Sequence, residues 1–183
     1  MTPIITLSQL GTFLSFNREK LMDALSLFSP DQRTLTEKKE GWNPVQIVEH
    51  IGIIDNYVVN KVADMLKNAP LYPPEEEDQK LIDVMPLFKE NGIIGSKITA
   101  PSNTIPTGQV NYEEGLHRLT ESLNDLLAFF PELADRQTNF IIDRHPLGVD
   151  LNVCQWIHFT AVHEWAHVNQ IKCIAKVNGL LAV

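Results

Sequence analysis

Two histidines near the C-terminus, His163 and His167, are four residues apart in the chain. On an α-helix this spacing places both side chains on one face, one turn apart. The same face continues through mostly apolar residues on either side, which predicts that it packs against the protein interior. Burying two imidazoles side by side requires a partner for each ring. A metal ion bound by both rings is one efficient partner.

A third histidine, His50, interrupts the apolar face of another predicted helix, between Ile47 and Ile54. Three neutral imidazoles that converge inside a helical bundle form a site for Zn, Ni or Fe, with coordination positions left open for water or substrate. A single histidine on an apolar face is more often a hydrogen-bonded core residue. The pattern by itself therefore leaves both interpretations of these histidines open.

The other histidines fit a shared site less well. His158 precedes His163 by five residues, a step of about 140° around a helix, so it faces elsewhere. His117 neighbours the apolar face of a third helix and is expected at the surface or beside the site. His145 lies in a predicted turn near the mouth of the bundle, where a structural role is favoured over contact with substrate.

The letters His163-Glu164-x-x-His167 also match the motif of zinc proteases, in which Glu164 would be the general base. That motif requires a third ligand, usually downstream, and the residues after His167 include no Glu or His. A helical bundle also lacks the edge strand that holds a peptide substrate. The protease interpretation is therefore disfavoured, and Glu164 stays a candidate catalytic residue.

The spacing of apolar residues predicts four helices, over residues 6–28, 44–69, 111–130 and 153–178. Asn43 can cap the second helix, and Pro44 fits its first turn, where a missing N–H is harmless. Four helices with little strand predict an all-α four-helix bundle, and the length suits a single domain over residues 1–183.

A long connection, residues 70–110, separates the second and third helices. It is rich in proline and glycine and includes an acidic run, with a short helix expected over residues 80–89 and broken at Pro86. In a bundle, such a crossover lets the third helix run parallel to the second. Further on, residues 140–142 are expected to be extended, and residues 145–148 to form a turn.

Composition argues against several classes of partner. The net charge of −8, without a run of Lys and Arg, predicts no nucleic-acid and no membrane-surface binding. No apolar run approaches membrane-spanning length, and no signal peptide is evident. Cys154 and Cys173 would be about 28 Å apart on one helix, too far for a disulfide, and they fall off the histidine face. We therefore expect a reduced, cytoplasmic protein.

Taken together, these residues resemble the DinB-like (YfiT-like) superfamily of metal-binding four-helix bundles. The resemblance covers nearly the whole chain and rests on residues 42–50 and 145–171, which end in His163-x-x-x-His167-x-x-Gln170-Ile171. It implies an up-down-down-up bundle with the long crossover after the second helix, and His50, His163 and His167 as metal ligands. Many relatives have Arg before the final histidine, where this chain has Ala166, which puts any role of that arginine in doubt.

The resemblance also implies a range of activities. Members of known activity include transferases and isomerases that use low-molecular-weight thiols such as bacillithiol or mycothiol, and others look like metal-dependent hydrolases. An open metal site lowers the pKa of a bound thiol and would equally activate water. We therefore expect a metal-dependent transferase acting on a small thiol and an electrophile. The alternatives are a metal-dependent hydrolase and a non-catalytic metal-binding stress or interaction module, and homodimerisation is implied by the resemblance alone.

Three carboxylates lie near the predicted ligands in sequence. Glu49, Asp55 and Glu164 are candidates to orient an imidazole by accepting its free N–H. The alternative for each is a solvated position on a helix surface.

Overall fold

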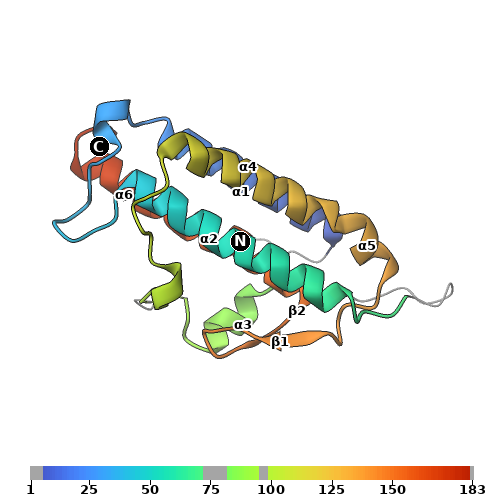
Figure 1. Cartoon of the computed structure of the whole chain (residues 1–183). Helices are drawn as coiled ribbons and strands as arrows, with labels where there is room; N and C mark the ends of the chain where they lie inside the picture. The colour runs from blue at the N-terminus through green and yellow to red at the C-terminus, as the bar shows by residue number, and fades with distance from the viewer. Residues whose placement is uncertain (1–5, 72–81, 95–98, 182–183) are drawn as a thin grey trace.

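The computed structural model describes residues 6–71, 82–94 and 99–181 of the chain. Four long helices lie side by side, with a small hairpin and a short helix along one side of them (Figure 1). The predicted four-helix bundle is thus confirmed. In chain order the elements are α1 (Leu7–Leu25), the 3-10 helix η1 (Pro30–Gln32), α2 (Pro44–Leu66), α3 (Met85–Glu90), the 3-10 helix η2 (Ser102–Thr104), α4 (Tyr112–Ala128), α5 (Phe130–Asp135), β1 (Ile142–Arg144), β2 (Asp150–Asn152) and α6 (Val153–Val177).

Polar caps fix where the long helices begin. Thr6, Asn43 and Asn152 each accept a hydrogen bond from the backbone N–H three residues later, where a glutamine bonds back to the cap. This reciprocal pair satisfies two backbone N–H groups that the first helical turn leaves without partners. Pro44 occupies the first turn of α2, as predicted. The two helices that carry the candidate metal ligands therefore start at positions specified by local sequence.

Contacts between α1 and α6 show that these helices run in the same direction. Phe13 packs edge-on against His158, and Arg18, further along α1, bonds to Glu164, further along α6. The first and last helices of the chain are thus parallel neighbours in the bundle.

The second and third long helices, α2 and α4, are also parallel. Val48 packs against Gly115, and seven residues later in each helix Asp55 accepts a hydrogen bond from Ser122. Parallel neighbours require a long connection, which the crossover between α2 and α4 supplies. The arrangement is the up-down-down-up order that the resemblance implied.

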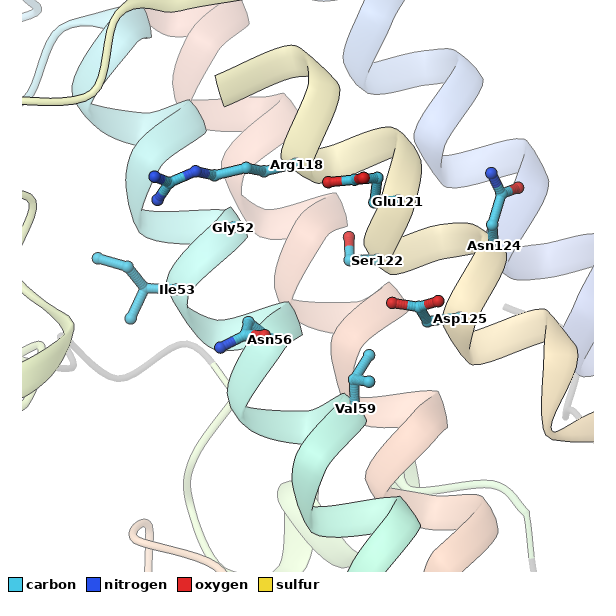
Figure 2. A pocket seen from close by; sticks show the side chains of 9 residues that line it. All are labelled: Gly52, Ile53, Asn56, Val59, Arg118, Glu121, Ser122, Asn124 and Asp125. Atoms are coloured by element: carbon cyan, nitrogen blue, oxygen red, sulfur yellow. The ribbon is translucent and has the colours of Figure 1, made fainter. Parts of the chain in front are cut away.

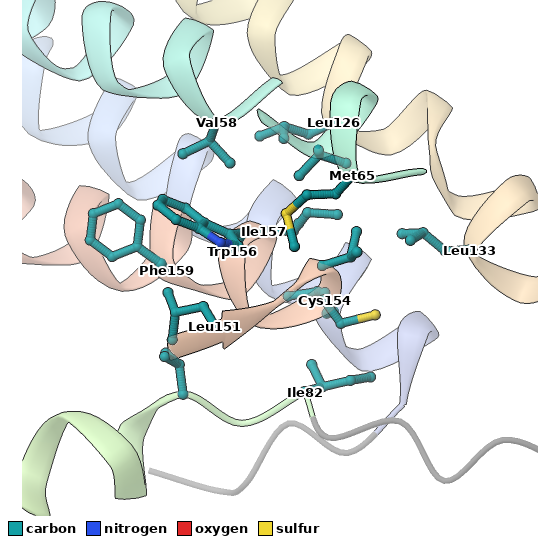
Figure 3. Close-up of a cluster of buried hydrophobic side chains, with 14 of the residues drawn as sticks. Val58, Met65, Ile82, Leu126, Leu133, Leu151, Cys154, Trp156, Ile157 and Phe159 are labelled. Atoms are coloured by element: carbon teal, nitrogen blue, oxygen red, sulfur yellow. The ribbon is translucent and has the colours of Figure 1, made fainter. Parts of the chain in front are cut away.

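The core is divided into two apolar halves by a layer of buried polar side chains. The larger half lies toward the hairpin and includes the fully buried Trp156, Leu126 and Leu151 (Figure 3). The smaller half lies at the other end and includes Leu21 and Ile171. We call the residues between them the polar layer; it consists of Asn17, Arg18, Asp55, Ser122 and Glu164, all buried.

Pro86, predicted to break a helix, instead begins one, and Pro131, which directly follows the helix predicted over residues 111–130, begins the next helix. Pro86 lies in the first turn of α3 and Pro131 in the first turn of α5. Proline is tolerated there because the N–H it lacks has no helical partner in any case. The helix predicted over residues 80–89 is therefore wrong in its bounds, although residues 80 and 81 lie outside the described part of the chain.

The segment predicted to be extended, with a turn after it, forms an antiparallel hairpin. Ile142 pairs with Asn152 and Arg144 with Asp150, and Gly148 adopts a positive φ of 84° in the connecting turn. The hairpin leads directly into the cap of α6. Within the described ranges, no helix is both long and apolar enough to span a bilayer.

Because α2 packs closely on α4, a methyl group added at Gly115 is expected to destabilise the protein. A Cβ added at Gly115 would lie 2.6 Å from Cγ1 of the buried, β-branched Val48. We expect Gly115→Ala to lower the free energy of unfolding by about 1–3 kcal/mol, although alanine favours a helix over glycine by about 1 kcal/mol. Urea denaturation measures the change.

Gly52 on α2 provides the matched control. A Cβ there meets only the Cβ of Arg118, at 3.9 Å. Gly52→Ala is expected to raise the free energy of unfolding by about 0.5–1 kcal/mol. If both variants changed stability by the same amount, the tight contact at Gly115 would be contradicted.

Candidate metal centre

His50 of α2 and the pair His163 and His167 of α6 meet on the inner side of these two antiparallel helices. The Nε2 atom of His163 lies 3.2 Å from Nε2 of His50 and 3.1 Å from Nε2 of His167. One ligand atom from each residue lies within 4.8 Å of the others. Imidazole nitrogens bound 2.0–2.1 Å from a tetrahedral zinc ion are about 3.3 Å apart, so the spacing suits a shared ion.

Hydrogen bonds at the far side of two rings determine where their protons are. Nδ1 of His50 lies 2.6 Å from the carbonyl oxygen of Thr104, and Nδ1 of His167 lies 2.8 Å from Oε1 of Gln170. Both oxygens only accept hydrogen bonds, so each Nδ1 donates its proton. In a neutral ring Nε2 then carries a lone pair. The partners of Nδ1 thus direct two lone pairs toward Nε2 of His163.

His163 by itself cannot satisfy both neighbours. A single Nε2–H on His163 has one proton to donate, whereas two lone pairs face it. Its own Nδ1 is buried and has no hydrogen-bond partner among the described residues. A cation at the meeting point would satisfy all three Nε2 atoms at once. The donor set therefore fits a bound metal ion.

Burial keeps the three rings uncharged. Loss of solvent lowers the pKa of His50, although the hydrogen bond to Thr104 opposes the shift. Burial and the proximity of His50 lower the pKa of His167 to about 4, and burial with the neighbouring imidazoles holds the pKa of His163 well below its ordinary value. Neutral imidazoles are the form that binds metals, so these lowered pKa values favour metal binding over protonation.

Aromatic side chains flank the histidine cluster on both sides. The ring of Trp42 is 4.7 Å from that of His50, centroid to centroid, and the ring of Phe159 is 5.6 Å from that of His163. His50 itself is buried, but His163 and His167 are only half-buried. Two of the three histidines therefore keep part of their surface in contact with solvent.

The remaining histidines have other partners. His117 is exposed and lies 3.1 Å from Glu121, and buried His158 contacts the backbone at Val84. His145 is buried in the hairpin turn, where its Nδ1 accepts a hydrogen bond from the N–H of Leu147. Burial lowers the pKa of His145 to about 4. None of these three belongs to the cluster, in agreement with their sequence positions.

The three candidate carboxylates are buried rather than solvated, and their hydrogen bonds go to groups other than imidazoles. Asp55 and Glu164 share Arg18: its Nη2 lies 2.8 Å from Oδ2 of Asp55, and its Nε 2.5 Å from Oε1 of Glu164. Burial raises the pKa of both carboxyls, that of Glu164 to about 7, while Arg18 opposes the shift. Glu49 instead accepts hydrogen bonds from Thr107 and Gly108 of the crossover. A catalytic role for Glu164 stays a prediction.

The groups that orient the rings were not predicted from the sequence. Thr104 and Gln170 supply the two oxygens, and Gln170 was recognisable as the residue one turn after His167. No local pattern connects Thr104 to His50, because the two are 54 residues apart in the chain. The contact also shows that the described part of the crossover folds toward the histidine cluster.

A groove on the surface lies elsewhere, between α2 and α4 (Figure 2). Its volume is about 680 Å³. Two of its charged residues are paired on the surface, Arg118 with Glu114 and Glu121 with His117. None of the three clustered histidines lines it, so the groove is separate from the candidate metal centre.

Comparisons with known proteins agree with this architecture. The sequence model of the DinB superfamily matches residues 14–171. The chain is 24% identical, over 164 residues, to the uncharacterised protein YuaE of Bacillus subtilis strain 168, covering 88% of this chain and 95% of that protein. A crystal structure of an uncharacterised protein from Escherichia coli UTI89 is similar over 98% of both chains, with a TM-score of 0.59 and 14% identity. At that identity the structural likeness concerns the fold alone.

The polar layer generates a prediction about pH and stability. Replacing Arg18 by methionine leaves two buried carboxylates without their shared cation, which costs about 3–5 kcal/mol at pH 8. Burial already raises the pKa of Asp55 and of Glu164 in the folded protein. In the variant, these two carboxyls therefore bind protons at a higher pH in the folded state than in the unfolded state, and protonation removes the unpaired charges. The deficit relative to the parent should therefore shrink as the pH falls from 8 to 5, in urea denaturation at each pH.

An exposed ion pair serves as the control for Arg18→Met. Arg144 and Asp150 are 2.9 Å apart and both largely exposed, so Arg144→Met should change stability by less than about 1 kcal/mol at either pH. A small, pH-independent loss in Arg18→Met would contradict the role of Arg18 as the partner of two buried charges.

Proposed function

The chain belongs to the DinB superfamily, and we propose that it is a divalent-metal enzyme that transfers a low-molecular-weight thiol to an electrophile. His50, His163 and His167 are the proposed ligands. The observation that carries the proposal is the convergence of their three Nε2 atoms on one point. Three imidazoles leave coordination positions free, as a metal that acts on a substrate requires.

The residues around the proposed metal ion have distinct tasks. When bound, a divalent ion held by three neutral imidazoles supplies Lewis acidity, which lowers the pKa of a thiol beside it. Thr104 and Gln170 keep the rings in the tautomer whose Nε2 is free to bind. Trp42 and Phe159 form apolar walls that limit the water around the site.

A metal-dependent hydrolase is the second candidate function. Burial raises the pKa of Glu164 to about 7, a value suited to a general base at neutral pH. The Glu164 carboxylate, however, is engaged by Arg18 at 2.5 Å. A hydrolase with Glu164 as its base would need that carboxylate free of Arg18, whereas the transferase makes no use of it, so we favour the transferase.

Metal binding is the first prediction of this proposal. The parent protein, supplied with Zn, Ni or Fe and then desalted, should retain close to one ion per chain in plasma mass spectrometry. His50→Ala and His163→Ala should each lose the ion, because two imidazoles bind far more weakly than three. His117→Ala, which changes an exposed histidine, should retain it. A parent that takes up no metal would remove the basis of the proposed enzyme.

Thiol-dependent turnover is the second prediction. We expect loss of an electrophile such as monochlorobimane to require a small thiol and to slow about 100-fold or more in His50→Ala, but not in His117→Ala. Fluorescence of the bimane adduct measures the rate. Cleavage of an ester or amide without thiol would favour the hydrolase instead. Tight metal binding with neither activity would indicate a non-catalytic metal-binding module.

A further inference from the structure

Glu49, the residue before His50, is a buried carboxylate that binds the crossover. Glu49 is 5% exposed, and its carboxylate accepts three hydrogen bonds. Oε1 lies 2.9 Å from the N–H nitrogen of Thr107 and 2.6 Å from its hydroxyl, and Oε2 lies 2.9 Å from the N–H nitrogen of Gly108. These bonds outweigh the effect of burial and hold the pKa of Glu49 below its ordinary value. The carboxylate is therefore ionised, and hydrogen bonds to it are strong.

The segment that Glu49 holds is the one that supplies the partner of His50. Thr104 precedes Thr107 by three residues, and both its N–H and its hydroxyl bond to the carbonyl of Pro101, at 2.9 and 2.8 Å. These local bonds make residues 101–104 a compact turn with the Thr104 carbonyl facing α2. Gly108 directs its backbone N–H toward the Glu49 carboxylate. Its φ is 72°, a backbone conformation that residues with a side chain rarely adopt.

The rings of His50 and His167 are oriented in different ways. His167 depends on Gln170, which lies on the same helix and is placed by helix geometry alone. His50 depends on a carbonyl from a distant segment, whose position relative to α2 is not fixed by any helix. Glu49 is the described side chain that connects that segment to α2 next to His50.

We propose that Glu49 is a positioning residue of the metal centre. It holds residues 101–108 against α2, so that the Thr104 carbonyl keeps the proton of His50 on Nδ1 and leaves Nε2 free to face His163 and His167. Glu49 itself touches neither substrate nor metal. The importance of this role for metal affinity rests on the proposed function, but the role in the tautomer of His50 does not.

Glu49→Gln tests the proposal with little change in size. A glutamine can still accept from Thr107, but its NH₂ group would face the N–H of Gly108, donor against donor. We expect the zinc affinity to fall about 10-fold or more, measured by competition with a chromophoric chelator. In the zinc-free protein, ¹⁵N spectra of the imidazoles should show a larger fraction of His50 with its proton on Nε2, while His167 keeps its parent spectrum.

Two further variants make the test decisive. Glu114→Gln changes the same group at an exposed site paired with Arg118, and should leave affinity and spectra unchanged. Thr107→Val removes one of the three hydrogen bonds without altering Glu49, and should shift His50 in the same direction by a smaller amount. It also provides the measurement if Glu49→Gln fails to fold.

The two readouts separate the failure of each proposal. A parent protein without zinc affinity would remove the proposed function, and the zinc-free spectra would still decide the role of Glu49. An unchanged His50 spectrum in both Glu49→Gln and Thr107→Val would overturn the positioning role. A change that affected His50 and His167 equally would also overturn it, because it would reflect a general disturbance of the bundle.

Discussion

Nε2 of His163 faces a lone pair on Nε2 of His50 and another on Nε2 of His167. Much of the surrounding structure maintains this arrangement of the three rings. The lone pairs exist because two Nδ1 atoms donate to oxygens, and the rings stay neutral because burial makes their protonation unfavourable. Without a cation such an arrangement leaves buried nitrogens unsatisfied, which is costly. With a cation the same arrangement is preorganised, because the ligands are already close to the spacing that a small divalent ion requires.

The polar layer extends this arrangement across the bundle. Arg18, Asp55 and Glu164 connect three helices between two apolar halves of the core. A buried ionic network contributes little net stability compared with apolar packing, but it penalises any shift of one helix along another that would separate the charges. In this bundle the network joins α1 to both α2 and α6, and therefore opposes sliding of the two helices whose relative register sets the distance between His50 and His163.

The crossover combines two tasks. Topologically, it carries the chain back so that α4 can run parallel to α2. Chemically, its described part brings Thr104 to His50 and is held there by the buried Glu49 carboxylate. A long connection without regular structure is usually mobile unless side chains bind its backbone. At residues 107 and 108, one carboxylate accepts three hydrogen bonds, two of them from the backbone, next to the residue whose ring the segment orients.

Local sequence determined the helices and the histidine face, because caps at Thr6, Asn43 and Asn152 and the spacing of apolar residues act within a few residues of the chain. The long crossover similarly predicted the parallel pair of α2 and α4. Only the tertiary structure decided that Arg18 joins Asp55 to Glu164 and that Thr104 orients His50, since these contacts link residues 37 to 146 positions apart. The tertiary structure also decided where α3 and α5 begin. A proline is compatible both with the end of one helix and with the first turn of the next, and packing selects between the two.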